Sequence, residues 1–226
     1  MRRLFIFLFL VAIICTPCEA SFASLVANGD FETVDARVGN AKGVRLDSFD
    51  GITGRWDVYT SLPGGWMTSS GPGIEVQYDG VVVGAHSFSH YIELDSHPGP
   101  NSNSSMYQDI ILPHSGGYIL SFWYQPRTAL PDDNRIDVFF DGQLAVTANE
   151  TTSELNDWTE YSVSLFVADV SAPKRLIFSA GGLSNSFGGL LDDIELVPNP
   201  EPTTLLLMGA GLFGLASARR KFRGGR

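Results

Sequence analysis

The chain has 226 residues, of which 15 are basic, 25 are acidic and 44% are hydrophobic, and its formal net charge is −10. This length provides one domain with a sizeable core once the two ends are set aside. The acidic balance excludes nucleic acid and anionic lipid as favoured partners, because both carry the same sign of charge.

Residues 1–20 have the order of a secretory signal peptide. Two arginines precede an apolar run over residues 4–14, and small residues follow at Ala20 and Ala23. As a helix this run spans about 16 Å at ~1.5 Å per residue, which is too short for a stable membrane anchor. The pattern predicts an N-terminal signal helix, export through the inner membrane, and cleavage after residue 20 or as late as residue 23.

The domain that remains, residues 21–199, is more acidic than the whole chain. It keeps 8 basic and 23 acidic residues, a net charge near −15, and both cysteines of the chain lie within the signal segment. Disulfides are therefore excluded although export would permit them, and the domain must depend on its core, on a bound ion, or on both.

The interior of the chain predicts strands throughout. Several short segments are rich in β-branched and aromatic residues, alternate polar with apolar positions, and are separated by glycine-rich turns such as Asp141-Gly142. The best-defined strands cover residues 118–124, 135–140, 161–166, 175–179 and 190–197. No helical period appears between the signal and the tail, so the fold class predicted is an all-β antiparallel β-sandwich of the jelly-roll type.

Three acidic patches stand out along these strands. They are Asn-Gly-Asp-Phe-Glu at 28–32, Tyr-Ile-Glu-Leu-Asp at 91–95, and Leu-Leu-Asp-Asp-Ile at 190–194. Glu93 and Asp95 would lie on one face of a strand, and we expect both to be outward, solubilising carboxylates. Residues 95–105 carry two prolines among polar residues and predict a surface loop.

Four residues are candidates for binding a sugar. Trp66 follows a Pro-Gly-Gly turn that would hold its indole at the rim of the domain, and Tyr124, Arg127 and Asn134 flank another loop. Aromatic rings stack on the apolar face of a pyranose, and arginine or asparagine groups read its hydroxyls.

Catalytic motifs are weak in this sequence. No Gly-x-Ser-x-Gly elbow occurs, residues 21–199 contain no cysteine nucleophile, and adjacent acids such as Asp132 and Asp133 usually diverge in a turn. We therefore predict a protein that is not an enzyme, with a divergent glycoside hydrolase as an alternative.

The C-terminal end carries three features in succession. Pro200-Glu201-Pro202 is followed by an apolar stretch over 203–218 and by a cluster of basic residues. The stretch makes about 24 Å of helix at ~1.5 Å per residue, a short transmembrane helix, and the basic cluster holds its end in the cytoplasm. This 200–226 segment resembles the PEP-CTERM sorting signal. The resemblance implies transient membrane insertion, processing by an exosortase-type enzyme, and a protein at the surface of, or secreted by, a Gram-negative-type bacterium.

A second resemblance covers residues 25–197. The acidic patches, the Pro63-Gly-Gly-Trp66 turn and Leu-Ser-Phe-Trp-Tyr-Gln-Pro-Arg at 120–127 occur in an order similar to that of galactose-binding-like jelly rolls, which include carbohydrate-binding modules and a cell-wall family of unknown function.

That resemblance implies a structural Ca²⁺ between the first and last strands. Its ligands would be a backbone oxygen of Asp30, the carboxylate of Glu32, and a carboxylate of Asp192 or Asp193. Carboxylates gathered at paired strand ends repel one another unless an ion neutralises them, and Ca²⁺ takes six to eight oxygens.

Together these features predict an exported, envelope- or matrix-associated protein whose non-catalytic domain binds or organises extracellular polysaccharide. The alternative is a structural or adhesion protein with a protein partner.

Overall fold

The computed structural model describes residues 23–34, 56–96, 100–151, 157–199 and 211. The predicted signal helix and nearly all of the apolar stretch at 203–218 fall outside these residues. In the described part of the chain, no helix combines the length and apolarity needed to cross a membrane.

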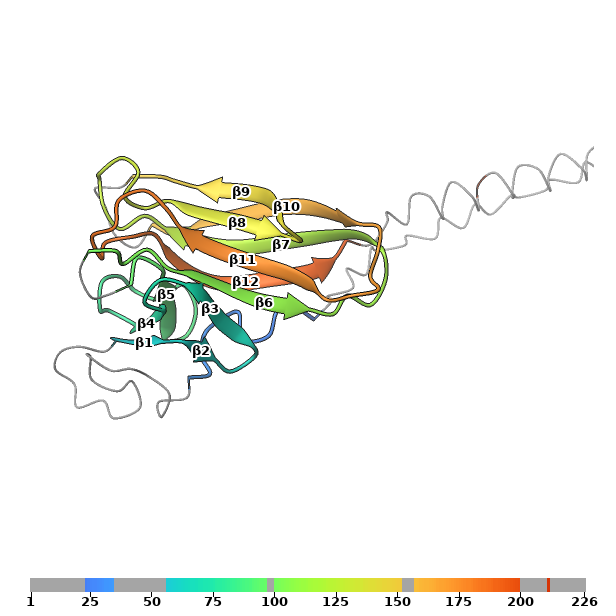
Figure 1. Ribbon diagram of the computed structural model, residues 1–226, viewed down its shortest axis with the longest axis horizontal. Coiled ribbons are helices and arrows are strands. Elements are labelled where there is room, and N and C mark those ends of the chain that lie inside the picture. The colour runs from blue at the N-terminus through green and yellow to red at the C-terminus, as the bar shows by residue number, and fades with distance from the viewer. Residues whose placement is uncertain (1–22, 35–55, 97–99, 152–156, 200–210, 212–226) are drawn as a thin grey trace, which may run out of the picture.

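Twelve strands of the described chain form two antiparallel sheets that pack face to face (Figure 1). Their bounds are β1 Trp56–Tyr59, β2 Ser61–Leu62, β3 Trp66–Ser70, β4 Ile74–Tyr78, β5 His90–Glu93, β6 Ser105–Ile110, β7 Gly116–Gln125, β8 Ile136–Phe140, β9 Gln143–Ala148, β10 Thr159–Val167, β11 Lys174–Ala180 and β12 Leu190–Pro198. Sheet A has the order β1-β4-β5-β12-β7-β10, and sheet B has the order β2-β3-β6-β11-β8-β9. The all-β antiparallel sandwich predicted from the sequence is confirmed.

The five best-defined sequence segments coincide with β7, β8, β10, β11 and β12. Their side chains alternate between the two faces, and the inward positions form one core between the sheets. Phe122 of β7 and Phe178 of β11 meet edge to face with ring centroids 5.2 Å apart. The core is thus closed within residues 23–199, which is the basis for treating this domain as a folding unit.

The β8–β9 hairpin confirms the predicted Asp141-Gly142 turn. Both residues have positive φ, 50° and 78°. This backbone geometry suits the twist of a tight hairpin, and it favours Asp followed by Gly.

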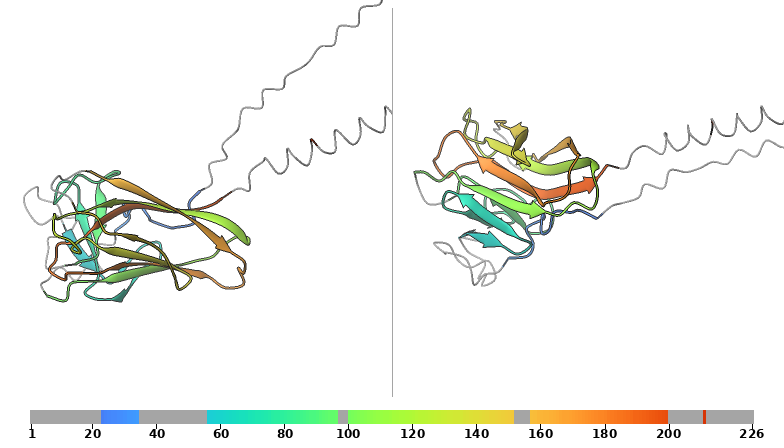
Figure 2. Two further views of the ribbon diagram at one scale, coloured as in Figure 1. Left: turned by 90° about the horizontal axis from the view of Figure 1, so that it is seen from above. Right: turned by 45° about the vertical axis from the view of Figure 1, so that its right-hand side comes forward.

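Residues 25–29 run along β12 at the opposite end of the sequence (Figure 2). The Leu25 amide donates to the Leu196 carbonyl at 2.8 Å, and the Ile194 amide donates to the Gly29 carbonyl at 2.9 Å. A Cβ at Gly29 would lie 2.0 Å from the Ile194 oxygen, so only glycine permits this approach. The two ends of the domain therefore leave it side by side.

Candidate ligand-binding site

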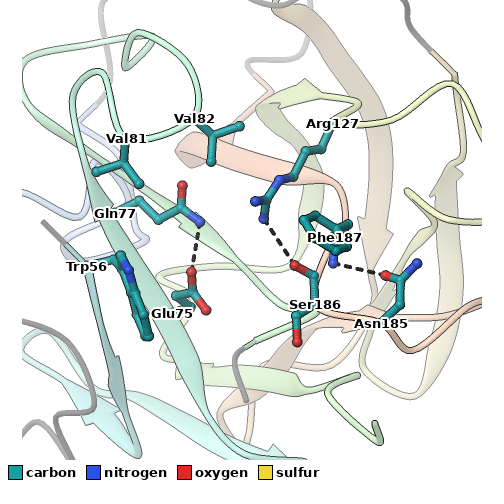
Figure 3. A pocket seen from close by; sticks show the side chains of 9 residues that line it. All are labelled: Trp56, Glu75, Gln77, Val81, Val82, Arg127, Asn185, Ser186 and Phe187. Carbon is teal, nitrogen blue, oxygen red and sulfur yellow. Dashed lines mark hydrogen bonds between the residues drawn. The ribbon is translucent and has the colours of Figure 1, made fainter. Parts of the chain in front are cut away.

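A pocket of about 310 Å³ opens on the outer face of sheet A (Figure 3). In β4 and β5, Ile74, Val76 and Ile92 face the core, so the alternate positions Glu75 and Glu93 lie on the opposite side of the sheet. The residues that line the pocket are Trp56, Glu75, Gln77, Val81, Val82, Arg127, Asn185, Ser186 and Phe187.

The walls come from segments that are far apart in the sequence. Trp56, the first residue of β1, stands on one side, and Arg127 and Phe187 stand on the other (Figure 3). The Arg127 guanidinium lies over the Phe187 ring, 4.7 Å from its centroid. The pocket thus combines a partly exposed indole with a cation that is stacked on an aromatic ring.

A buried polar network forms the floor. Gln77 donates from Nε2 to Oε1 of Glu75 at 2.8 Å and to Oε2 of Glu93 at 2.6 Å. Arg127 donates from Nη1 to the same Oε2 of Glu93 at 2.5 Å, and the Gly188 amide donates to Oε1 of Glu93 at 2.6 Å. The two glutamates and the arginine therefore hold one another in fixed positions.

Glu93 is fully buried, and this burial raises the pKa of its carboxyl to about 8. The Arg127 charge opposes the shift and the neighbouring Glu75 carboxylate adds to it. Because desolvation disfavours the charged form, the protonated form of Glu93 is populated at neutral pH.

Asp95 anchors the wall that carries Phe187. Its Oδ2 accepts the amides of Asn185 at 3.1 Å and Phe187 at 3.0 Å, and its Oδ1 accepts the Ser102 hydroxyl. A Cβ at Gly188 would lie 2.6 Å from the Asp95 Cβ, so the chain can pass this close only as glycine.

These positions correct two expectations from the sequence. Glu93 and Asp95 are 0% and 1% exposed and bind the 185–188 segment, whereas we expected outward, solubilising carboxylates. Ser102 and Ser104 are buried as well, so the 95–105 segment is not wholly a surface loop. The physical reason is that the segment before β12 folds over the outer face of β5 and offers backbone amides to both acids.

The upper rim of the pocket is held by two further aromatic residues. The Tyr91 hydroxyl accepts the amides of Val82 at 2.9 Å and Val83 at 3.1 Å. Trp158 donates from Nε1 to the Gly84 carbonyl at 2.9 Å. Because these bonds fix the β4–β5 connection, the pocket is pre-formed.

Of the four residues predicted to bind a sugar, Arg127 lines the pocket and the other three do not. Trp66 is fully buried against Phe31 and Phe178, and its Nε1 donates to the Asn28 carbonyl at 3.1 Å. The expected position of its indole at the rim is therefore wrong, because the glycine turn before it directs the first residue of β3 into the core.

Tyr124 and Asn134 are also fully buried. The Tyr124 hydroxyl donates to the Asn134 carbonyl at 2.9 Å, and the Asn134 side chain accepts the amides of Arg127 at 2.8 Å and Thr128 at 3.0 Å. They shape the loop that presents Arg127 and do not reach the pocket, which corrects their expected position at a ligand surface.

Sequence reasoning missed Gln77 and Phe187 as pocket residues. The alternation in β4 gave a usable signal, because Glu75 and Gln77 share the face opposite to Ile74 and Val76. The position of Phe187 depends on contacts between distant segments, and no local pattern signals it.

Three of the four acids predicted to hold calcium, Glu32, Asp192 and Asp193, bind residues 86–90. Glu32 accepts the amides of Ser89 at 2.8 Å and His90 at 2.7 Å, as well as the Ser89 hydroxyl. Its pKa is lowered, because these hydrogen bonds outweigh the desolvation that acts in the opposite direction. The carboxylate oxygens are thus occupied by hydrogen-bond donors.

Asp192 and Asp193 clamp the same loop from β12. Asp192 accepts the amides of His86 at 3.0 Å and Ser87 at 3.1 Å, and burial raises its pKa to about 8. Asp193 meets His86 Nδ1 at 2.6 Å and the Ser87 hydroxyl at 2.6 Å.

Asp30 lies apart from this clamp. It lines a second pocket of about 280 Å³ together with Asp193 and Glu195. Among the described residues no group of three or more His, Cys, Asp or Glu side chains is arranged to hold a metal. The acids as placed act as acceptors for a loop and do not form an oxygen cage, and the calcium site stays a prediction.

Comparison with known proteins identifies the tail. Residues 200–221 match the family model described as the PEP-CTERM protein-sorting motif. The motif indicates an exported protein that is sorted to the cell surface of a Gram-negative-type bacterium, as the sequence predicted. The chain is therefore a PEP-CTERM-bearing protein with a jelly-roll sandwich.

Two curated relatives are multifunctional-autoprocessing repeats-in-toxin proteins, one from Vibrio cholerae serotype O1 and one from Vibrio vulnificus. Each is 26% identical over 134 residues, which cover 58% of this chain. The match spans only 3% and 2% of the lengths of these toxins.

Solved structures with a similar fold include two carbohydrate-binding modules and the enzymatically active domain of a bacteriophage tailspike protein. A family 35 carbohydrate-binding module from Paenibacillus barcinonensis has a TM-score of 0.38 at 17% identity, over 60% of this chain and 94% of the module. A family 61 module in complex with β-1,4-galactotriose has a TM-score of 0.41 at 15% identity, over 74% and 99%. The tailspike protein 4 of bacteriophage CBA120 has a TM-score of 0.43 at 16% identity, over 78% and 21%. These likenesses concern the sandwich fold alone.

Proposed function

We propose that this exported domain binds extracellular polysaccharide in the pocket on the outer face of sheet A, and that it does so without catalysis. The observation that carries the proposal is the pairing of the Trp56 indole with the polar floor of Gln77 and Glu75 in one pre-formed pocket. A pyranose presents an apolar face and a rim of hydroxyls, and this pocket offers a surface for each.

The polar groups fit a hydroxylated ligand. Among the described residues, the hydrogen bonds of the Arg127 guanidinium all run through Nη1, to Glu93 and to the Ser186 carbonyl at 3.2 Å. The other guanidinium N–H groups are thus available to sugar oxygens at the pocket wall. The Glu75 carboxylate at the floor complements them by accepting hydroxyl protons.

The arrangement of the carboxylates supports binding without catalysis. Two acids that cleave a glycosidic bond must both reach it. Here Glu93 is fully buried beneath Gln77 and Arg127 and does not line the pocket. Among the described residues, Glu75 is the single carboxylate that lines the pocket, and it has no second carboxylate there as a partner for glycoside cleavage.

The tail supports display of the domain from the envelope. In this proposal the chain inserts transiently in the membrane through the apolar stretch at 203–218. An exosortase-type enzyme then processes the tail near Pro200-Glu201-Pro202. The domain at 21–199 then meets polysaccharide at the cell surface or in the surrounding matrix.

The test is retention of purified residues 21–199 in native gels that contain individual soluble polysaccharides, with a glycan array to define the unit recognised. We expect at least one polysaccharide to retard the domain and Trp56→Ala to reduce the retardation, in line with affinity that is about tenfold weaker. Phe166→Ala is the matched control, because Phe166 is an exposed aromatic residue on β10, away from the pocket. Equal mobility of the domain with and without every polysaccharide would contradict the proposal.

A further inference from the structure

An apolar row crosses the outer face of sheet B from β3 to β9. The strand register places one residue of each of the five strands directly opposite the next. The row consists of Met67, Tyr107, Ile177, Phe139 and Leu144. The chain neighbours of Tyr107, Ile177 and Phe139, such as Met106, Leu176 and Phe178, are buried in the core, so these three side chains point outward. The register places Met67 and Leu144 beside them, and both are exposed.

The row is open to solvent at both of its ends. Met67 is 43% exposed and Leu144 is 58% exposed, and the three residues between them are partly exposed. A solvated antiparallel sheet normally carries polar residues on its outer face. A continuous apolar row across five strands therefore indicates a surface that meets a partner.

The charges on this face are balanced, unlike those of the rest of the protein. Arg175 pairs with Asp109 through Nε at 2.8 Å, and Arg135 pairs with Asp137 through Nη2 at 2.8 Å. Three of the four basic residues in the described part of the chain lie on or beside sheet B, each with an acid: Arg135, Lys174 and Arg175. The excess negative charge of residues 21–199, near −15, is therefore not carried by these ion pairs.

From these observations we propose that the outer face of sheet B, defined by the Met67–Leu144 row and its flanking ion pairs, packs against the same face of a second copy of this chain. Two copies of an acidic protein repel each other least where their charges are balanced. A two-fold axis would set Asp109 of one copy against Arg175 of the other in both directions, so the face is self-complementary.

The composition of the row favours a protein partner over a glycan. Tyr107 is the one tyrosine of the row, and the row contains no tryptophan, the two residue types that stack best on sugars. The Arg175 guanidinium covers the Tyr107 ring, 4.0 Å from its centroid. Aliphatic side chains instead interdigitate with those of another sheet.

The size of the face predicts a weak and concentration-dependent dimer. Five strands at ~4.8 Å spacing span about 19 Å, and a six-residue strand such as β6 spans about 20 Å. The resulting face of about 400 Å² is about half of what each partner buries in a stable complex of standard size. Such an association becomes effective where many copies are displayed close together. It goes beyond polysaccharide binding, because the pocket lies on the other sheet and stays open in the dimer.

Sedimentation equilibrium of residues 21–199, up to about 1 mM, tests the proposal. We expect the average mass to rise with concentration, and to rise further with added salt, because salt screens the repulsion between the acidic copies. Leu144→Glu should weaken association at least tenfold. Met67→Glu should do the same from the other end of the row. Phe166→Glu adds the same charge at an exposed residue of sheet A and should leave association unchanged.

Three results would overturn the proposal. The first is a monomer at every concentration. The second is loss of association in Leu144→Glu alone, with Met67→Glu unchanged, which would assign the contact to the edge strand β9 and not to the face. The third is a monomeric domain in which Leu144→Glu abolishes retention by a polysaccharide, which would make the row a glycan surface. Because Leu144 and Met67 are exposed, we expect all variants to keep the melting temperature of the parent, and this check accompanies each measurement.

Discussion

Arg127 donates from Nη1 to Oε2 of the fully buried Glu93 at 2.5 Å, and through this bond the loop after β7 is joined to the floor of the sheet A pocket. The same guanidinium lies over Phe187 at 4.7 Å, so one side chain connects the floor with the wall that precedes β12. Removing one partner of this pair leaves a buried polar group without its hydrogen bond, which costs about 1–3 kcal/mol. The geometry of the pocket therefore depends on contacts between β5, the loop after β7 and the segment before β12, and not on one loop.

Two tryptophans should behave in opposite ways. Trp56→Ala removes a partly exposed pocket wall, so we expect polysaccharide affinity to fall about tenfold, or ~1–2 kcal/mol, with little change in melting temperature. Trp66→Ala removes a fully buried core residue and should cost ~3–5 kcal/mol of unfolding free energy. Titration calorimetry with the retained polysaccharide and thermal unfolding measure the two effects. A large loss of stability in Trp56→Ala would place its indole among the structural residues.

The stability of the domain should fall as the pH rises from about 5 to about 8. The pKa of Glu93 rises from 4.5 to about 8 on folding and that of Asp192 from 3.8 to about 8, in both cases chiefly because of burial. Between these values the unfolded chain has released protons that the folded domain still holds. Each group then lowers the unfolding free energy by about 1.4 kcal/mol per pH unit within that window. Glu32 has a lowered pKa and acts in the opposite sense, but only below about its usual value of 4.5.

Urea unfolding of the parent and of Glu93→Gln across pH 5–8 measures this dependence. The glutamine cannot ionise, so the variant should show a shallower decline than the parent, with the remainder due to Asp192. Identical slopes in the two proteins would mean that Glu93 is already ionised in the folded domain at pH 5.

The sequence was sufficient to predict the sandwich, because strand identity depends on local alternation and turn residues. The segment at 118–124 and the Asp141-Gly142 turn carry that information in themselves. The pocket could not be predicted in the same way. Trp66 and Trp56 both occur in glycine-rich surroundings, and only the long-range packing of β3 against Phe178 buries one and leaves the other at a pocket. The acids Glu93 and Asp95 were misplaced for the same reason, since their amide partners come from about ninety residues further along the chain.

The Glu32→Ala variant distinguishes two roles for Glu32, as a hydrogen-bond acceptor for the loop before β5 and as a calcium ligand. The structure assigns to Glu32 the amides of Ser89 and His90, so we expect this variant to lose about 2–3 kcal/mol of unfolding free energy even in a chelator. Asp30→Ala is the matched control, because Asp30 lies in the same segment and makes a single long hydrogen bond, at 3.4 Å. The measurement is thermal unfolding with excess chelator and with excess Ca²⁺.

The calcium site predicted from the sequence has a different signature. If Glu32 binds Ca²⁺, a free Ca²⁺ concentration about one hundred times the Kd would raise the unfolding free energy of the parent by about 2.7 kcal/mol. The same concentration would not stabilise Glu32→Ala. A melting temperature of the parent that rises with Ca²⁺, together with a variant that is normal in chelator, would replace the hydrogen-bond account with the calcium account.

The tail should direct its own removal. Pro200-Glu201-Pro202 directly follows Asn199, the residue after the end of β12. The Asn199 amide donates to the Gly117 carbonyl at 2.9 Å. Because that bond holds Asn199 against the sandwich, we expect a membrane enzyme to reach the chain only from residue 200 onward without unfolding the domain. Mass spectrometry of the protein recovered from the envelope or medium should therefore find a C-terminus close to residue 200. Replacing Glu201 with Gln should preserve the apolar stretch while blocking removal, so that the full tail is retained in the membrane fraction. Recovery of parent protein that still ends at Arg226 from the cell surface would contradict processing at this motif.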